Sequence, residues 1–188
     1  MSQYKAESLK KYFDDLAAKI PAPGGGSAAA LAAASAASLI SMVVNFTIGK
    51  PKYAQHENEL KEILEKSEKL RGDFLNLVDL DVIAYQSKDV RNALDVPFML
   101  ARLCFEAIKL CGDLVEKSNV NLISDVAVAA ILLESAFVSA YFNVDINLKL
   151  LGDKELEEKI RAELSQKEKQ ARKIRKETEE RVGQIIGR

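Results

Sequence analysis

The chain has 188 residues, a length that predicts one domain (1–188) with a substantial core. Its 27 basic and 28 acidic residues nearly cancel and form no basic patch with interleaved aromatics, so we expect no nucleic-acid partner. From the polar, charged start we expect no signal peptide, and the two cysteines and one histidine have no metal-ligand spacing. We therefore expect a cytoplasmic protein without a metal site.

The first predicted helix covers residues 2–20 and is stopped by Pro21 and Pro23. Its apolar residues at helical spacing are Leu9, Phe13 and Leu16. A loop follows in which Gly24, Gly25 and Gly26 let a ligand or another backbone approach closely.

Ser27, directly after the glycines, is a good N-cap for the next helix. The first turn of that helix has free N–H groups and a partial positive charge, which suit a carboxylate or a phosphate. No Gly-Lys-Ser/Thr sequence follows the glycines, so the loop is not a P-loop. The alternative is a glycine-rich loop that merely starts a helix.

The second predicted helix, residues 28–46, consists mostly of small residues, which let a neighbouring helix approach closely. Its apolar run is close to membrane length, but Ala and Ser stand where a spanning helix has Leu, Ile and Val. We expect a buried helix and no membrane partner. Gly49 and Pro51 end this segment, and Pro51 can open the next helix.

The third predicted helix, residues 51–89, has a clear apolar stripe. At about 100° per residue, Asp81 falls inside that stripe and Asp79 outside it. A lone carboxylate on an apolar face is costly unless it is paired or protonated, and buried carboxylates are where pKa values are tuned. Asp81 is therefore a candidate functional acid; the alternative is a buried aspartate bonded to a tyrosine or a backbone N–H.

Pro97 is expected to open a fourth helix, which ends near Ser118 and carries both cysteines. Seven residues apart on one helix, Cys104 and Cys111 are separated by about 10 Å along the axis, too far for a disulfide. A reducing compartment fits this spacing.

The fifth predicted helix is capped by Ser124 or Asp125, runs to about Leu151 and is apolar almost all round, which predicts a central position. Asp125 and Asn143 share an azimuth but lie about 27 Å apart along the axis. Either one of them is structural, or the site is assembled across a subunit interface. Asn143 and Asn147 lie four residues apart and suit hydrogen bonding.

Gly152 and Asp153 start a final helix that ends near Ile186, and its charge run predicts a solvated face. The predicted fold is all-α, an orthogonal or antiparallel bundle of about six helices with a small-residue central helix. The small-residue helix and the long last helix have more apolar face than one bundle of this size covers. We therefore expect at least a homodimer.

Several separated motifs resemble the cyclodeaminase/cyclohydrolase family of folate enzymes. That family includes the C-terminal half of formiminotransferase-cyclodeaminase and stand-alone methenyltetrahydrofolate cyclohydrolases. In chain order the motifs are P-A-P-G-G-G-S at 21–27, N-F-T-I-G-K at 45–50, D-L-D at 79–81, V-P-F at 96–98, N-V-N-L-I-S-D at 119–125 and N-V-D-I-N-L-K at 143–149. The resemblance covers roughly residues 2–186.

The resemblance implies a formiminotetrahydrofolate cyclodeaminase, which closes 5-formiminotetrahydrofolate to 5,10-methenyltetrahydrofolate with loss of ammonia. It implies no cofactor beyond the folate substrate, which can carry a polyglutamate tail. One alternative is a methenyltetrahydrofolate cyclohydrolase, which opens the methenyl bridge with water. The other is a folate-binding or scaffold protein without catalysis.

The catalytic residues implied are Asp81, Lys50 and Asp125. Asp81 is a proton shuttle or a pterin anchor, and Lys50 polarises the substrate or binds the glutamate tail. For Lys50 the alternative is a solvent lysine near a helix end, and for Asp125 a helix-start residue. The implied substrate-binding residues are Gly24, Gly25, Gly26, Ser27, Asn45, Asn143 and Asn147.

Overall fold

The structure, a computed structural model, describes residues 3–188, and all of its regular elements within that range are helices. The α-helices are α1 (Leu9–Ala17), α2 (Gly25–Asn45), α3 (Glu57–Ser87), α4 (Val90–Lys117), α5 (Ile123–Leu151) and α6 (Lys154–Ile186). Three short 3₁₀-helices connect them: η1 (Tyr4–Ala6), η2 (Pro51–His56) and η3 (Val120–Leu122). The predicted all-α fold with six helices is confirmed.

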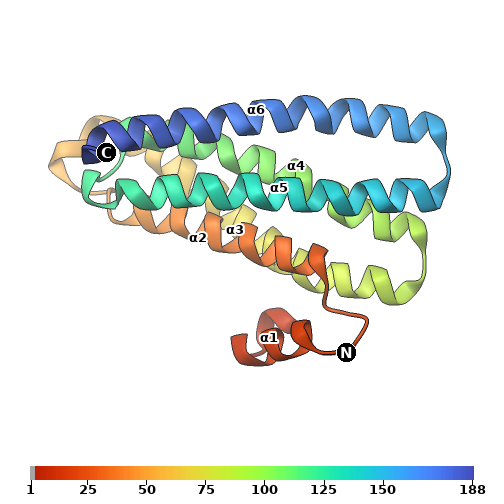
Figure 1. Cartoon of the computed structure of the whole chain (residues 1–188). Coiled ribbons are helices and arrows are strands. Elements are labelled where there is room, and N and C mark those ends of the chain that lie inside the picture. The colour runs from red at the N-terminus through yellow and green to blue at the C-terminus, as the bar shows by residue number, and fades with distance from the viewer. Residues whose placement is uncertain (1–2) are drawn as a thin grey trace.

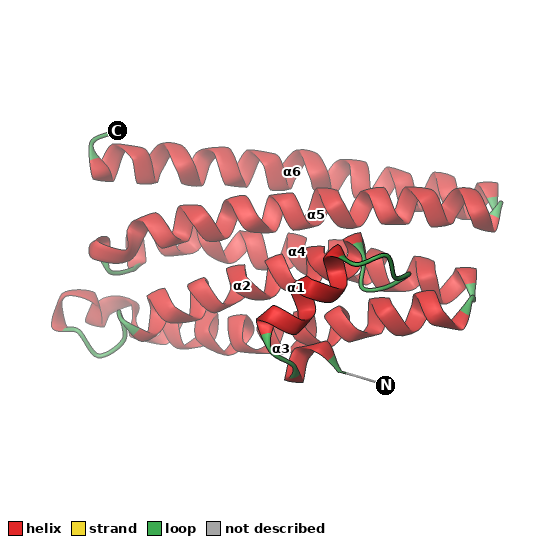
Figure 2. Cartoon of the chain, turned by 60° about the horizontal axis from the view of Figure 1, so that its bottom comes forward, coloured by secondary structure: helices red, strands yellow, loops and turns green. Residues whose placement is uncertain are grey.

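The five long helices form an elongated bundle, with α6 along one edge and the short α1 outside the opposite edge (Figure 1). Helix α2 packs against α3 and α5, α4 packs against α5, and α6 covers α4 and α5. Short connections between consecutive long helices make these neighbours antiparallel. Figure 2 shows α1 crossing the bundle beside the start of α2.

Helix α2 contains no ionisable residue and buries a row of alanines, so α3 and α5 approach it closely. It is not enclosed on all sides, because a stripe of small and apolar residues along its length faces outward. The more open residues of this stripe are Gly25, Ala28, Leu31, Ala32, Ser35, Ser38, Leu39, Met42 and Asn45.

The N-terminal helix is shorter than expected and turns a different face to the core. Instead of one helix over residues 2–20, η1 and α1 are separated by Glu7 and Ser8, and the Ser8 side chain caps α1 by accepting from the Lys11 N–H. Leu9 and Phe13 are exposed, and Tyr12 is the buried residue of α1. The spacing argument was wrong here because α1 packs on the bundle through tyrosine.

Two predicted helix starts are also wrong. Helix α4 begins at Val90, where Asp89 caps it, and Pro97 lies inside the helix rather than at its start. Helix α5 begins at Ile123, directly after η3, whose first N–H groups are capped by Asn119. A side chain further upstream thus caps α4, whereas α5 continues from η3 and has no side-chain cap of its own.

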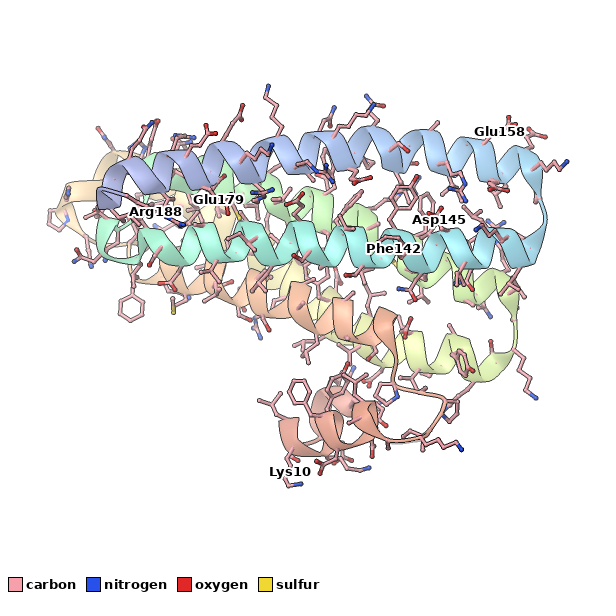
Figure 3. All side chains as sticks on the ribbon, in the orientation of Figure 1. Lys10, Phe142, Asp145, Glu158, Glu179 and Arg188 are labelled. Carbon is pink, nitrogen blue, oxygen red and sulfur yellow. The ribbon has the colours of Figure 1, made fainter. Side chains whose placement is uncertain are left out.

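The last helix agrees with the sequence: Asp153 caps α6 by accepting from the Leu156 N–H, and long charged side chains project outward from it (Figure 3). Two helical segments, Gly25–Asn45 and Val120–Leu151, are long and apolar enough to cross a membrane by length and composition alone. In α2, 61% of that window is buried inside the bundle, as in the core helix of a soluble protein.

Candidate active site

A cleft of about 290 Å³ lies where α2 begins, between the glycine loop, α3 and the C-terminal part of α5. It contains most of the residues that the sequence predicted for a site. Its lining is Pro21, Ala22, Gly24, Gly25, Gly26, Asp81, Ala84, Tyr85, Ala93, Asn143, Ile146, Asn147 and Leu150.

The Asp81 carboxylate is held against the first turn of α2. Its Oδ2 accepts a hydrogen bond of 2.9 Å from the backbone N–H of Ser27. A Cβ added to Gly26 would lie 2.0 Å from the Asp81 Oδ1, so only glycine leaves room for the carboxylate here. The sequence predicted that the glycines let a ligand or another backbone come close. In the structure the group that comes close is the Asp81 carboxylate.

Ser27 is not the N-cap that the sequence predicted. Helix α2 starts three residues earlier, with Gly24 as its N-cap and the Ala28 N–H donating to the Gly24 carbonyl. The buried Ser27 hydroxyl accepts from the Tyr12 hydroxyl at 3.2 Å and donates to the Val78 carbonyl at 3.0 Å. Ser27 therefore ties α1, α2 and α3 together beside Asp81.

Burial raises the pKa of Asp81 above its ordinary value, and the hydrogen bond from the Ser27 N–H opposes that shift in part. A carboxyl with a raised pKa holds its proton closer to neutral pH, as a group that both donates and accepts a proton must. Burial also raises the pKa of Tyr12, whose hydroxyl therefore stays a hydrogen-bond donor near neutral pH.

Asp79 is not on the solvent side of α3, as the periodicity predicted. Its side chain is 8% exposed, and neither carboxylate oxygen has a hydrogen-bond partner. The N-terminal segment packs on this side of α3, where Lys5 donates to Asn76, one turn before Asp79. The periodicity of α3 shows which residues face the other long helices. It does not show that the N-terminal segment covers Asp79.

Two amides complete the cleft from α5. The Asn143 Nδ2 donates to the Ser139 carbonyl at 2.8 Å, and the Asn147 Nδ2 donates to the Ala93 carbonyl at 2.6 Å. Both amides keep an unused Oδ1 as an acceptor. The Ala93 carbonyl is available because the residue four positions later is Pro97, which has no N–H to donate.

The cleft therefore combines acceptors with donors. Asp81, Asn143 and Asn147 offer carboxylate and amide oxygens, while the N–H groups of Gly25 and Gly26 have no acceptor within α2. This arrangement suits a flat heterocycle with several N–H donors next to an acceptor or anionic group. Among residues 3–188, no cluster of His, Cys, Asp and Glu side chains has the arrangement of a metal site.

Three predicted site residues lie at the other end of the bundle. Asn45 ends α2, Lys50 follows it as an exposed residue, and Asp125 lies in the first turn of α5. Gly25 and Asn45 are about 30 Å apart along α2. Within one chain the structure does not bring these three residues to Asp81.

A second cleft, of about 390 Å³, opens at that far end. It is lined by Ser38, Ser41, Met42, Asn45, Phe46, Glu68 and Arg71. A larger cleft of about 470 Å³, between α3 and α4, contains no predicted site residue.

A protein-family model described as Formiminotransferase-cyclodeaminase matches residues 8–88 and 86–166. The chain belongs to this family. One relative of similar extent is the methenyltetrahydrofolate cyclohydrolase of Methylorubrum extorquens, which is 35% identical over 84% of this chain and 87% of that protein.

Other members of the family are larger. The formimidoyltransferase-cyclodeaminase of Rattus norvegicus is 29% identical over 84% of this chain, which spans only 34% of the rat protein. Among solved structures, formiminotetrahydrofolate cyclodeaminase from Thermotoga maritima superimposes with a TM-score of 0.83, covers 98% of both chains and is 28% identical. The cyclodeaminase fold is thus shared over nearly the whole chain.

Sequence reasoning missed two residues of this candidate site, Tyr12 and Pro97. Tyr12 reaches Ser27 from outside the bundle, and no local pattern indicates that contact. Pro97 carried a signal, since a proline at the eighth position of a helix frees a carbonyl four residues earlier for another donor.

Proposed function

We propose that this protein is a formiminotetrahydrofolate cyclodeaminase, which needs no cofactor beyond its folate substrate. The observation that carries the proposal is the Asp81 carboxyl, whose pKa is raised by burial in a cleft of glycines and asparagines. It is supported by the family and by the likeness to the Thermotoga maritima enzyme.

In the first step, the anilino nitrogen N10 attacks the formimino carbon on N5. The formimino group reacts as its protonated amidinium form, so the π electrons of its C=N bond move onto the nitrogen as the new C–N10 bond forms, and that nitrogen becomes a neutral amino group. The Asp81 carboxylate accepts the proton that N10 loses. The cleft walls bring N10 and the carbon into contact, because the reaction is intramolecular and depends on geometry.

In the second step, the protonated Asp81 donates to the amino group of the tetrahedral carbon. The C–N bond breaks, ammonia leaves with the bonding pair, and the N5 lone pair completes the methenyl bridge. One carboxyl thus returns to its starting state after each turnover. The raised pKa of Asp81 favours this exchange of a proton near neutral pH.

The pterin ring is proposed to lie against α5, where its N–H edge donates to Asn143 and Asn147. Both side chains line the cleft and have an acceptor oxygen left after bonding to backbone carbonyls. The cleft volume of about 290 Å³ is at the lower end for small-molecule sites, so it fits the ring system better than the whole folate.

A second candidate is the methenyltetrahydrofolate cyclohydrolase reaction, which is supported by the 35% identity and matching length of the Methylorubrum extorquens relative. Water adds to the same bridging carbon and Asp81 takes one of its protons. Asp81 returns this proton to N5 as the C–N5 bond breaks, and the remaining hydroxyl loses its proton to solvent to leave the formyl group of 10-formyltetrahydrofolate. The same residues serve because both tetrahedral intermediates carry one leaving nitrogen beside Asp81.

Supplying each substrate separately tests the proposal. With 5-formiminotetrahydrofolate we expect the absorbance of the methenyl product to appear and ammonia to be released in equal amount, with or without a chelator. Turnover of 5,10-methenyltetrahydrofolate alone would assign the cyclohydrolase reaction. Tight folate binding without turnover of either would leave the binding-protein alternative.

A further inference from the structure

Tyr85 is the tyrosine of this chain that the rest of the protein does not hold in place. The sequence contains five tyrosines, and the hydroxyl of each of the others takes part in a hydrogen bond within the protein: Tyr4, Tyr12, Tyr53 and Tyr141. Within residues 3–188, the Tyr85 hydroxyl has no hydrogen-bond partner, and its ring contacts no other aromatic ring and no cation. Tyr85 is 59% exposed, so packing does not account for an aromatic side chain at this position.

Tyr85 lines the cleft that contains Asp81. It follows Asp81 by four residues on α3, which is about one helical turn or 6 Å along the axis, so the two side chains share one face of the helix. Among the described residues that line the cleft, Tyr85 is the only aromatic one, and the other large apolar side chains, Ile146 and Leu150, are aliphatic. The cleft therefore offers a ligand a single aromatic ring.

The arrangement of α3 and α5 places Tyr85 level with Asn147. Both helices are antiparallel to α2, as the hydrogen bonds near the two ends of α2 show, and they are therefore parallel to each other. Asp81 and Asn143 both reach the first turn of α2, where a Cβ added to the glycines would meet their side chains. One turn further along α3 and α5 are Tyr85 and Asn147. The cleft thus has two levels, Asp81 with Asn143 and Tyr85 with Asn147.

The second level has room for a flat ring. Ala84 and Ala93 also line the cleft there, and the Ala93 carbonyl accepts the hydrogen bond from Asn147. Each of these alanines fills the cleft with no more than a methyl group. A ring that donates its edge to Asn147 therefore has Tyr85 as the side chain with enough area to cover its face.

We infer that Tyr85 stacks on the pyrimidinone half of the pterin and so determines the affinity for the heterocycle, an inference that rests on the proposed function. With its N–H edge on Asn143 and Asn147, the pterin extends over both levels. N5 and N10 lie at the level of Asp81, because that carboxyl exchanges their protons. The pyrimidinone then lies at the level of Tyr85.

The chemistry of reduced folate agrees with this orientation. The tetrahydro ring that carries N5 is puckered and has no π face, whereas the pyrimidinone is flat and conjugated, so only the pyrimidinone can stack on an aromatic side chain. The aminobenzoyl ring is bonded to N10 and leaves the cleft on the side away from Tyr85.

Stacking on Tyr85 contributes to binding and not to proton transfer. The pyrimidinone is unchanged between the bound substrate and the transition state, so Tyr85 stabilises both equally and its loss raises KM with kcat unchanged. Stacking of a nucleic-acid base on an aromatic side chain changes affinity by about tenfold or more, and we expect an effect of this size.

Steady-state kinetics with 5-formiminotetrahydrofolate gives the first test. We expect Tyr85→Ala to raise KM about tenfold or more with kcat within about twofold of the wild type, and Tyr85→Phe, which keeps the ring, to behave as the wild type. Ile83→Ala is the matched control, since it shortens an exposed side chain of α3 that does not line the cleft. An unchanged KM for Tyr85→Ala, or a Tyr85→Phe enzyme as impaired as Tyr85→Ala, overturns the inference.

Calorimetric titration with two fragments of folate tests the inference without turnover. For 6-methyltetrahydropterin, which has no tail, the dissociation constant of Tyr85→Ala should exceed that of the wild type about tenfold or more. For p-aminobenzoylglutamate, which has no pterin, the two proteins should behave alike. A loss confined to p-aminobenzoylglutamate, or a wild type that does not bind the pterin, contradicts the inference. If the wild type binds the pterin but turns over neither folate, the proposed function fails, and the pterin titrations still decide the role of Tyr85.

Discussion

At the scale of single residues, the chemistry of the cleft depends on how Asp81 is packed. Gly26 lets the carboxylate reach the backbone of α2, the Ser27 N–H holds one oxygen, and the surrounding protein removes water. These three effects act on one side chain and can be separated by substitution.

We expect Asp81→Asn to lower turnover by about a hundredfold or more, the scale of losing a proton-transferring group. Asp79→Asn is the matched control, since it makes the same change two residues away at a side chain that lines no part of the cleft. Steady-state turnover rates of the two variants test whether the loss is specific to Asp81. Equal losses would mean that Asp81 acts through the structure of α3 and not on substrate.

Gly26→Ala should be nearly as damaging as Asp81→Asn, because the new Cβ would occupy the position of the Asp81 Oδ1. Gly72→Ala, also within a helix but with nothing within 4 Å of the added Cβ, should leave turnover unchanged and stabilise the protein by about 0.5–1 kcal/mol. Turnover and denaturant unfolding measure both effects. A fully active Gly26→Ala enzyme would contradict the packing described for Asp81.

The raised pKa of Asp81 also predicts how stability depends on pH. The folded protein holds this proton more tightly than the unfolded chain, so stability from Asp81 is fully present below the ordinary pKa of about 3.9. It is lost as the pH rises through the raised, folded pKa. The free energy of unfolding of the wild type minus that of Asp81→Asn should therefore decrease with pH in urea titrations, and an increase would be inconsistent with a raised pKa.

At the scale of helices, one hydrogen bond joins α4 and α5 at a backbone carbonyl that, in an uninterrupted helix, would be bonded within α4 itself. Pro97 leaves the Ala93 carbonyl without a helical donor, and Asn147 of α5 supplies one. The proline is tolerated inside α4 because another helix replaces the missing bond. The bond also restrains the rotamer of Asn147, whose side chain lines the cleft.

A double-mutant cycle tests this exchange. Asn147→Ala should destabilise the wild type by about 1–3 kcal/mol, the cost of an acceptor left without a partner. In a Pro97→Ala background it should cost clearly less, because that substitution restores a backbone N–H that can donate to the Ala93 carbonyl. Asn143→Ala is the control, since its partner carbonyl at Ser139 keeps a helical donor. Additive effects in the cycle would show that Pro97 and Asn147 are independent.

The sequence predicted the helix types, the helix order and the start of the last helix at Gly152 and Asp153, because these depend on periodicity and on near neighbours. It also grouped the glycine loop with Asp81, but only through the family resemblance. The sequence prediction failed where contacts between distant elements determine the structure. Pro97 stays inside α4 because of Asn147, and Asp79 is buried because the N-terminal segment covers it. Local patterns carry no information on such contacts.

At the scale of the whole molecule, α4 lies inside the bundle and keeps both thiols from solvent. Cys104 and Cys111 are fully buried, and burial raises the pKa of the Cys111 thiol to about 12. Each is less reactive than an exposed thiol, because the thiolate is the reactive form. The two thiols therefore report on opening of the bundle.

We expect a thiol reagent to modify Cys104 and Cys111 at one common rate, which equals the rate of unfolding measured by circular dichroism in the same urea concentration. In native buffer the reaction should be slow on the scale of exposed thiols. A single fast thiol would show that α4 opens locally without the rest of the bundle.

The contact between Gly26 and Asp81 also means that the residue allowed at position 26 depends on the residue at position 81. A lineage that keeps the carboxylate must keep glycine at 26, because any side chain there would meet the Asp81 oxygen. A lineage that has lost the chemistry has no such restriction, and an alanine at 26 would then be favoured by its helix propensity. Glycine at this position in a helix of alanines is thus explained by the acid at position 81.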